Sequence, residues 1–131
     1  MMNIQVTVAN LLVMWVSATT LASLILFRSL DMWRAGDVIG ARIRLGFGLF
    51  LIAVGLEYFW WLLRWMLLDA NLQTLSRWFV DNAWLTLWAG LLATIGVAIS
   101  IASLLWPAMR WQGIAIAAIG VAATWSVGFT I

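Results

Sequence analysis

The sequence contains no cysteine and no histidine. Without cysteine the chain cannot form disulfides, thiolate nucleophiles or cysteine-rich zinc sites. Without histidine it cannot ligate haem through His or build a Ser–His or Cys–His catalytic pair. No aspartate lies inside an apolar run, which argues against intramembrane proteolysis by two aspartates. We therefore expect no enzymatic activity, no catalytic residue, no cofactor and no metal site.

Charge is also scarce. Charged residues make up 9% of the chain, and all seven basic residues are arginine. The high pI of about 10.5 reflects a small surplus of arginine and not a basic patch. Because no arginine cluster lies on a soluble module, the sequence gives no support for binding to nucleic acid.

What the sequence has in abundance is apolar length. Hydrophobic residues make up 66% of the chain, and they gather in four runs, about 8–27, 45–68, 83–106 and 114–131. Each run is close to the ~20 residues that a helix needs to cross a bilayer. The runs are continuously apolar and not alternating, which favours helices over a barrel. The sequence predicts an all-α polytopic integral membrane protein: one transmembrane domain, 1–131, folded as a four-transmembrane-helix bundle with short loops, with the lipid bilayer as its first partner.

Arginine counts in the loops predict the orientation. The first loop and the third turn together hold five arginines, whereas the second loop side holds two. The five are Arg28, Arg34, Arg42, Arg44 and Arg110, and the two are Arg64 and Arg77. We expect the first loop and the third turn to face the cytoplasm and both termini to lie outside it. The arginine-rich loop can serve anionic lipid or a partner, but topology determination is the simpler interpretation.

The loops carry their own local signals. In the first loop Ser29 can cap a short turn, Gly36 can end it, and Asp37 can cap a second helix that begins near Val38. The second loop has apolar residues on one helical face, namely Leu72, Leu75 and Phe79, which predicts a short amphipathic helix in the outer interface. Pro107 should end the third span.

Tryptophan is unusually frequent, with eleven residues. Six of them lie around the second loop: Trp60, Trp61, Trp65, Trp78, Trp84 and Trp88. Indole rings favour the membrane interface, so we expect an interfacial belt. The alternative is an aromatic cage for a cation, formed by Tyr58, Trp60 and Trp61 near Glu57.

Glu57 is the one acid that lies centrally in an apolar run, so it predicts a polar intramembrane site together with Arg64. An isolated carboxylate at mid-membrane costs several kcal/mol, so Glu57 should face protein or water and be protonated or paired. Arg64 lies about 10 Å further along the helix, too far for a direct pair. A proton or cation site and a pore lining are the functional interpretations. The structural one is a hydrogen bond to a hydroxyl of a neighbouring span: Thr19, Thr20, Ser23, Thr94 or Ser100.

Small residues recur at helical spacing in the last two runs. The fourth run carries Gly113, Ala117, Gly120, Thr124 and Gly128 on one face, and Gly90 lies in a similar series with Thr86 and Thr94 in the third. Such faces let helices approach closely in lipid. We expect the fourth face to be buried, in this chain or against another, with Ile114, Ile116 and Ile119 facing lipid. Gly120→Leu should then disrupt packing more than Ala118→Leu.

In its general plan the chain resembles holins, small phage membrane proteins that accumulate and open the inner membrane. It is short, almost wholly transmembrane and without an enzyme motif. The resemblance implies a viral protein of the bacterial inner membrane that oligomerises through its small-residue faces. The span count and the uncharged C-terminal end depart from well-known holin classes. The alternatives are an accessory or structural subunit of a larger membrane assembly, and a small proton-coupled transporter using Glu57, although small multidrug transporters carry their key glutamate in the first span.

Overall fold

The computed structural model describes residues 4–130, with the backbone alone at 125–130. The helices are α1 (Ile4–Arg34), α2 (Val38–Asp69), α3 (Gln73–Asp81), the 3-10 helix η1 (Ala83–Thr86), α4 (Leu87–Leu105) and α5 (Trp111–Thr130). No strand occurs in the part of the chain that the structure describes. The all-α class is therefore confirmed.

Three stretches are long and apolar enough to cross a membrane: α1, α2 and Ala83–Leu105, which joins η1 to α4. These helices make the chain a membrane-embedded helical protein in its general class. The fourth expected span, 114–131, extends past the described side chains, and the apolar helix described in full, Trp111–Thr124, is shorter than a span. A four-span count is therefore not confirmed.

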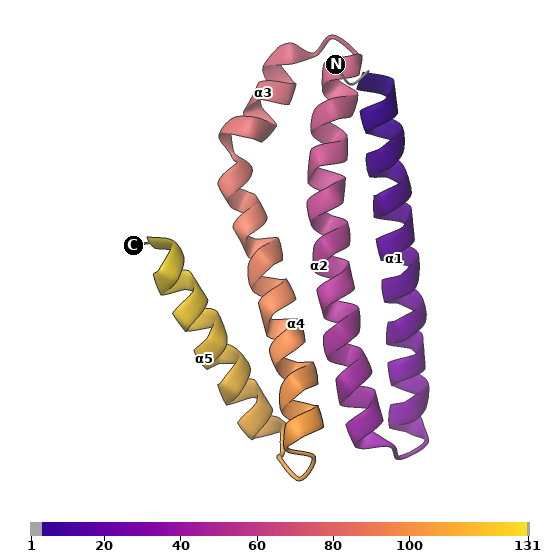
Figure 1. The fold of residues 1–131 in the computed structure, drawn as a ribbon, viewed down its shortest axis with the longest axis vertical. Helices are drawn as coiled ribbons and strands as arrows, with labels where there is room; N and C mark the ends of the chain where they lie inside the picture. The colour runs from indigo at the N-terminus through magenta and orange to yellow at the C-terminus, as the bar shows by residue number, and fades with distance from the viewer. Residues whose placement is uncertain (1–3, 131) are drawn as a thin grey trace.

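The long helices lie side by side in an open row, in the order α1, α2, α4, α5 (Figure 1). Each packs mainly against its neighbours in that row, and α5 diverges from α4 toward its C-terminal end (Figure 1). The four-helix bundle that we expected takes the form of this open row in the described chain. Lipid offers no hydrophobic drive that would close a ring of helices, so contacts form where side chains allow close approach.

The turn between α1 and α2 follows part of the sequence prediction. α2 begins at Val38, and a carboxylate oxygen of Asp37 accepts a hydrogen bond from the Gly40 backbone N–H at 3.0 Å. Gly36 takes a φ of +89°, which favours glycine at the end of α1. The predicted cap at Ser29 is wrong, because α1 continues unbroken to Arg34. The Ser29 hydroxyl instead donates to the Ala41 carbonyl at 2.6 Å and links the two helices.

The contact between α2 and α4 depends on two glycines that the sequence analysis did not single out. A Cβ atom on Gly96 would lie 2.5 Å from the Gly46 carbonyl oxygen and 2.8 Å from the Phe50 nitrogen. One turn later the Ser100 hydroxyl donates to the Ile43 carbonyl at 2.7 Å. The backbones therefore touch at Gly46 and Gly96, as small residues permit in lipid.

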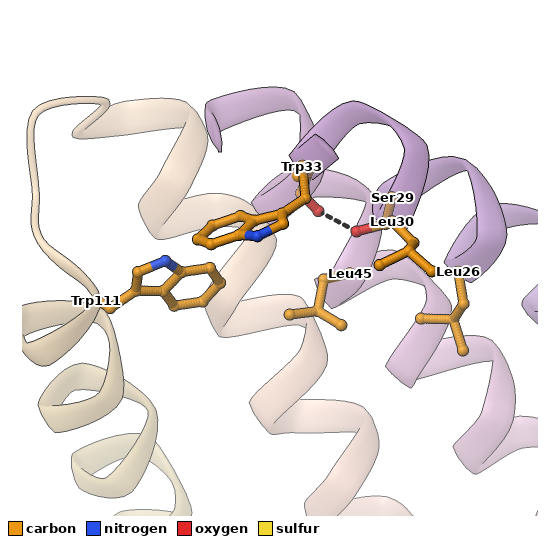
Figure 2. Close-up of a pocket in the computed structure, with 7 residues that line it drawn as sticks. Leu26, Ser29, Leu30, Trp33, Leu45 and Trp111 are labelled. Carbon is orange, nitrogen blue, oxygen red and sulfur yellow. Dashed lines mark hydrogen bonds between the residues drawn. The ribbon is translucent and has the colours of Figure 1, made fainter. Parts of the chain in front are cut away.

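The start of α5 packs against the α1–α2 hairpin at the end of the row where both turns lie (Figure 1). Arg42 is only 7% exposed and donates from Nη1 to the Met109 carbonyl. Its guanidinium lies over the Trp111 ring, 4.6 Å from the centroid, and the Trp33 and Trp111 rings lie 5.9 Å apart (Figure 2). These contacts hold the α4–α5 turn against α2, and a hollow of about 390 Å³ remains beside the two indoles.

Candidate functional site

Glu57 lies in an open groove of about 450 Å³ on one face of the α2–α4 pair. The groove takes its walls from α2, α3, η1 and the first turn of α4. It is lined by Leu56, Glu57, Phe59, Trp60, Leu63, Trp78, Phe79, Leu85, Thr86, Trp88 and Ala89. Thr86 is the one lining residue with a hydroxyl group, and it donates to the Ala83 carbonyl at 2.6 Å. Among the lining residues, Glu57 carries the one ionisable side chain.

Aromatic rings of α2 and α3 form one wall of the groove. Trp60 meets the Phe79 ring edge-on, with 4.7 Å between centroids, and its indole Nε1 donates to the Phe79 carbonyl at 3.2 Å. The Trp78 ring lies 6.0 Å from Trp60 and 5.3 Å from Phe79. The expected cage of Tyr58, Trp60 and Trp61 is therefore wrong in composition. Only Trp60 lines the groove, because consecutive positions on one helix point in different directions.

Glu57 has no intramolecular partner among the side chains that the structure describes, those of residues 4–124. Its side chain is exposed, and neither a hydrogen bond nor an ion pair joins it to the rest of the described chain. Of the five hydroxyl residues proposed as partners, three donate elsewhere: Ser23 to the Thr19 carbonyl, Thr94 to the Gly90 carbonyl and Ser100 to the Ile43 carbonyl. None of the five hydrogen-bonds Glu57 in the described chain, so the expectation of a structural hydrogen bond from these residues is wrong.

The helix register places Glu57 away from the centre of the third span. Gly46 faces Gly96 and Ile43 faces Ser100, so the antiparallel course of α2 and α4 sets Glu57 level with Leu85. Leu85 belongs to η1, where the third span begins. α2 is 32 residues long, about 48 Å, and therefore exceeds the bilayer core. The mid-membrane depth expected for Glu57 from the apolar run stays a prediction.

Arg64 is not part of the Glu57 groove. It lines a separate polar hollow with Gln73, Ser76, Arg77 and Asp81, while its guanidinium lies over the Trp65 ring, 4.4 Å from the centroid. The Arg64 carbonyl accepts a hydrogen bond from the Ser76 hydroxyl, which fixes α3 against α2. The two residues predicted as one polar site therefore lie in two hollows.

The tryptophans predicted as an interfacial belt gather at one end of the row. Trp60, Trp61 and Trp65 are half-buried on α2, whereas Trp78, Trp84 and Trp88 are exposed. Trp78 belongs to α3, and Trp60 of α2 contacts Trp78 and Phe79 of that helix. The short helix predicted from its apolar face is confirmed and runs over Gln73–Asp81. The location of these tryptophans at the level of the membrane surface stays a prediction.

The small-residue face of α5 is not the one that packs within the chain. Ile114 and Ala118 are 1% and 6% exposed and face α4, whereas Ala117, Gly120 and Thr124 are exposed. A Cβ atom on Gly120 would meet nothing within 4 Å. The placement of Ile114 toward lipid is therefore wrong, and the burial of Ala118 on the packing face removes the reason for expecting Ala118→Leu to have a small effect. Gly113 and Gly90 are half-buried, and the side-chain environment of Gly128 lies outside the described residues. Burial of this face against another chain stays a prediction.

Comparison with known proteins adds no relative: no family model, no curated protein and no solved structure matches the chain.

Proposed function

We propose that the protein is a non-enzymatic membrane protein that associates laterally with copies of itself and permeabilises the bacterial inner membrane, as holins do. The observation that carries the proposal is Glu57, an exposed carboxyl group without an intramolecular partner on a membrane-spanning helix. Such a group is costly against acyl chains. A second copy or a water-filled lumen between copies supplies the polar surroundings that one chain lacks.

The open row provides surfaces for this association. α5 contacts the rest of the described chain mainly through α4, and its exposed face carries Ala117, Gly120 and Thr124. In lipid, small-residue faces of this kind allow backbones to approach and associate. No residue of α5 lines the Glu57 groove. If copies associate through α5, the groove therefore stays open unless a neighbouring copy covers it.

We further propose that α5, continued to Ile131, crosses as the fourth span and that both termini lie outside the cytoplasm. Arg28, Arg34, Arg42, Arg44 and Arg110 lie where α1 meets α2 and where α4 meets α5, at one end of the row. Reporter fusions at Met1, Gly36, Asn71 and Ile131 should report an external, cytoplasmic, external and external site, respectively. A cytoplasmic reporter at Ile131 would show that α5 does not cross.

Gly120→Leu provides the test of assembly. The leucine enters open space in the single chain, so folding should be preserved, but it should separate α5 from a second copy. We expect the wild-type protein to collapse the membrane potential of an expressing bacterium, as followed by a potential-sensitive dye. Gly120→Leu should delay or abolish that collapse and reduce the crosslinked oligomer.

The matched control is Ala115→Leu, which adds bulk to an exposed side of α5 that lies about 140° around the helix from Gly120. It should leave both the collapse and the oligomer unchanged. If both variants depolarise the membrane as the wild type does, α5 is not the association surface. If the wild type is harmless on expression, the permeabilising function is wrong.

Two alternatives use the same features. An accessory subunit would cover the α5 face with another membrane protein, and it would be harmless and copurify with that protein. A proton-coupled exporter is favoured by the aromatic walls around Glu57, which suit a hydrophobic cation. It would give substrate-dependent transport that Glu57→Gln abolishes.

A further inference from the structure

A second groove combines two arginines with an apolar floor. It lies between α1 and α2 near their connecting turn, and its volume is about 440 Å³. Its lining residues are Leu24, Ile25, Arg28, Ile43, Arg44 and Phe47. Arg28 and Arg44 lie 16 positions apart in the sequence, and both line this groove. Arg42 lies between them in the sequence, but its side chain is buried and donates to the Met109 carbonyl.

Neither arginine of this groove forms an ion pair in the part of the chain that the structure describes. Arg28 is exposed, and Arg44 makes one hydrogen bond, from Nη1 to the Gly40 carbonyl at 3.3 Å. Within the described residues no acidic side chain lines the groove or forms an ion pair with either arginine. The acids closest to the two arginines in the sequence are Asp31, three residues after Arg28 on α1, and Asp37, which caps α2, and neither lines the groove.

The helices order these groups along the membrane normal. Arg28 lies six residues before the end of α1 and Arg44 six residues after the start of α2, so both stand about 9 Å from the connecting turn. Leu24 and Phe47 lie three to four residues further toward the middle of the helices. Cationic groups at the turn end and apolar groups deeper in the groove match the order of phosphate and acyl chain in a phospholipid.

We propose that this groove binds one anionic phospholipid, with its phosphate between Arg28 and Arg44 and one acyl chain along Leu24 and Phe47. Arginine binds phosphate through directed, charge-assisted hydrogen bonds. Basic pockets between transmembrane helices are a recurrent form of anionic headgroup site. The site is independent of the assembly proposed above, because neither α5 nor Glu57 contributes to it.

The test is the affinity of the protein in mixed micelles for spin-labelled phosphatidylglycerol relative to spin-labelled phosphatidylcholine, measured as the motionally restricted lipid fraction. The wild type should prefer phosphatidylglycerol. The double variant Arg28→Gln/Arg44→Gln should lose that preference by about thirtyfold, which corresponds to about 1 kcal/mol for each arginine that hydrogen-bonds the phosphate. Soluble glycerol phosphate should not compete, since it lacks the acyl chain.

The control is Arg34→Gln/Arg110→Gln, which removes the same charge from exposed positions at the same end of the molecule. It should lower the preference less than threefold. Equal losses in the two double variants would show that the preference is only the general attraction of a basic surface, and the proposal would be overturned. The same conclusion follows if the wild type has no preference.

A second measurement does not depend on the folding of the double variant. A photo-crosslinking phenylalanine analogue at Phe47, which is half-exposed in the groove, should capture phosphatidylglycerol over phosphatidylcholine. The same analogue at Ile116, exposed on α5, should capture both lipids alike. Capture without preference at Phe47 would exclude the site.

Discussion

An alanine in place of Gly96 should destabilise the protein, although the same replacement at Gly120 should not. The added Cβ at position 96 would lie 2.5 Å from the Gly46 carbonyl and 2.8 Å from the Phe50 nitrogen, both of which are backbone atoms. Backbone atoms cannot swing aside as a flexible side chain does, so α2 and α4 must separate. Overpacking of this kind costs typically 1–3 kcal/mol, and Gly96→Leu should exceed about 3 kcal/mol.

Gly120→Ala is the matched control, with the opposite sign expected. No atom lies within 4 Å of the Cβ position there, and alanine is the better helix former by up to about 1 kcal/mol. The free energy of unfolding in mixed micelles, followed by circular dichroism as a denaturing detergent is added, gives both values. Equal effects of the two alanines would show that the Gly46–Gly96 contact does not hold α2 to α4.

The contrast between Gly96 and Gly120 shows which features of the fold could not be predicted from the sequence. Local signals were sufficient at the start of α2 but not at Ser29. Gly36 and Asp37 correctly placed that start, because a positive φ and a capping carboxylate act within a few residues. Packing faces were harder to predict. α5 is apolar all round, so its sequence does not distinguish the Ile114–Ala118 face from the Gly120 face.

The candidate site was predictable in one residue and not in its surroundings. Glu57 stands out as an acid within an apolar run. Its neighbours Trp78 and Trp88 come from segments that follow α2, and only the register of α2 against α4 brings them to it. That register is set at Gly46 and Gly96. The same contact sets which residue of the third span lies level with Glu57. The length of α2 alone could not predict that level, since a 32-residue helix has no fixed centre relative to a bilayer.

Glu57→Leu should stabilise the protein and abolish the permeabilising activity that we propose. The carboxyl group is exposed without an intramolecular partner in the described chain, in a groove whose other lining is almost entirely apolar. Leucine removes the cost of solvating that group at the membrane, so the free energy of unfolding in micelles should rise by about 1–3 kcal/mol. If the carboxyl group faces a polar lumen between copies, the same change removes the lumen's polar lining, and the membrane potential should no longer collapse on expression.

Two further variants separate charge from position. Glu57→Gln retains a polar side chain of the same size, so it should keep part of the depolarising activity if solvation of the lumen matters, and none if proton exchange matters. Asp69→Leu removes an exposed acid from the end of α2, outside both the groove and the apolar region. It should change neither stability nor activity, because water already solvates that carboxylate. Depolarisation by Glu57→Leu at the wild-type rate would remove Glu57 from the mechanism, and a loss of stability would mean that its carboxyl group has a favourable partner in the folded protein.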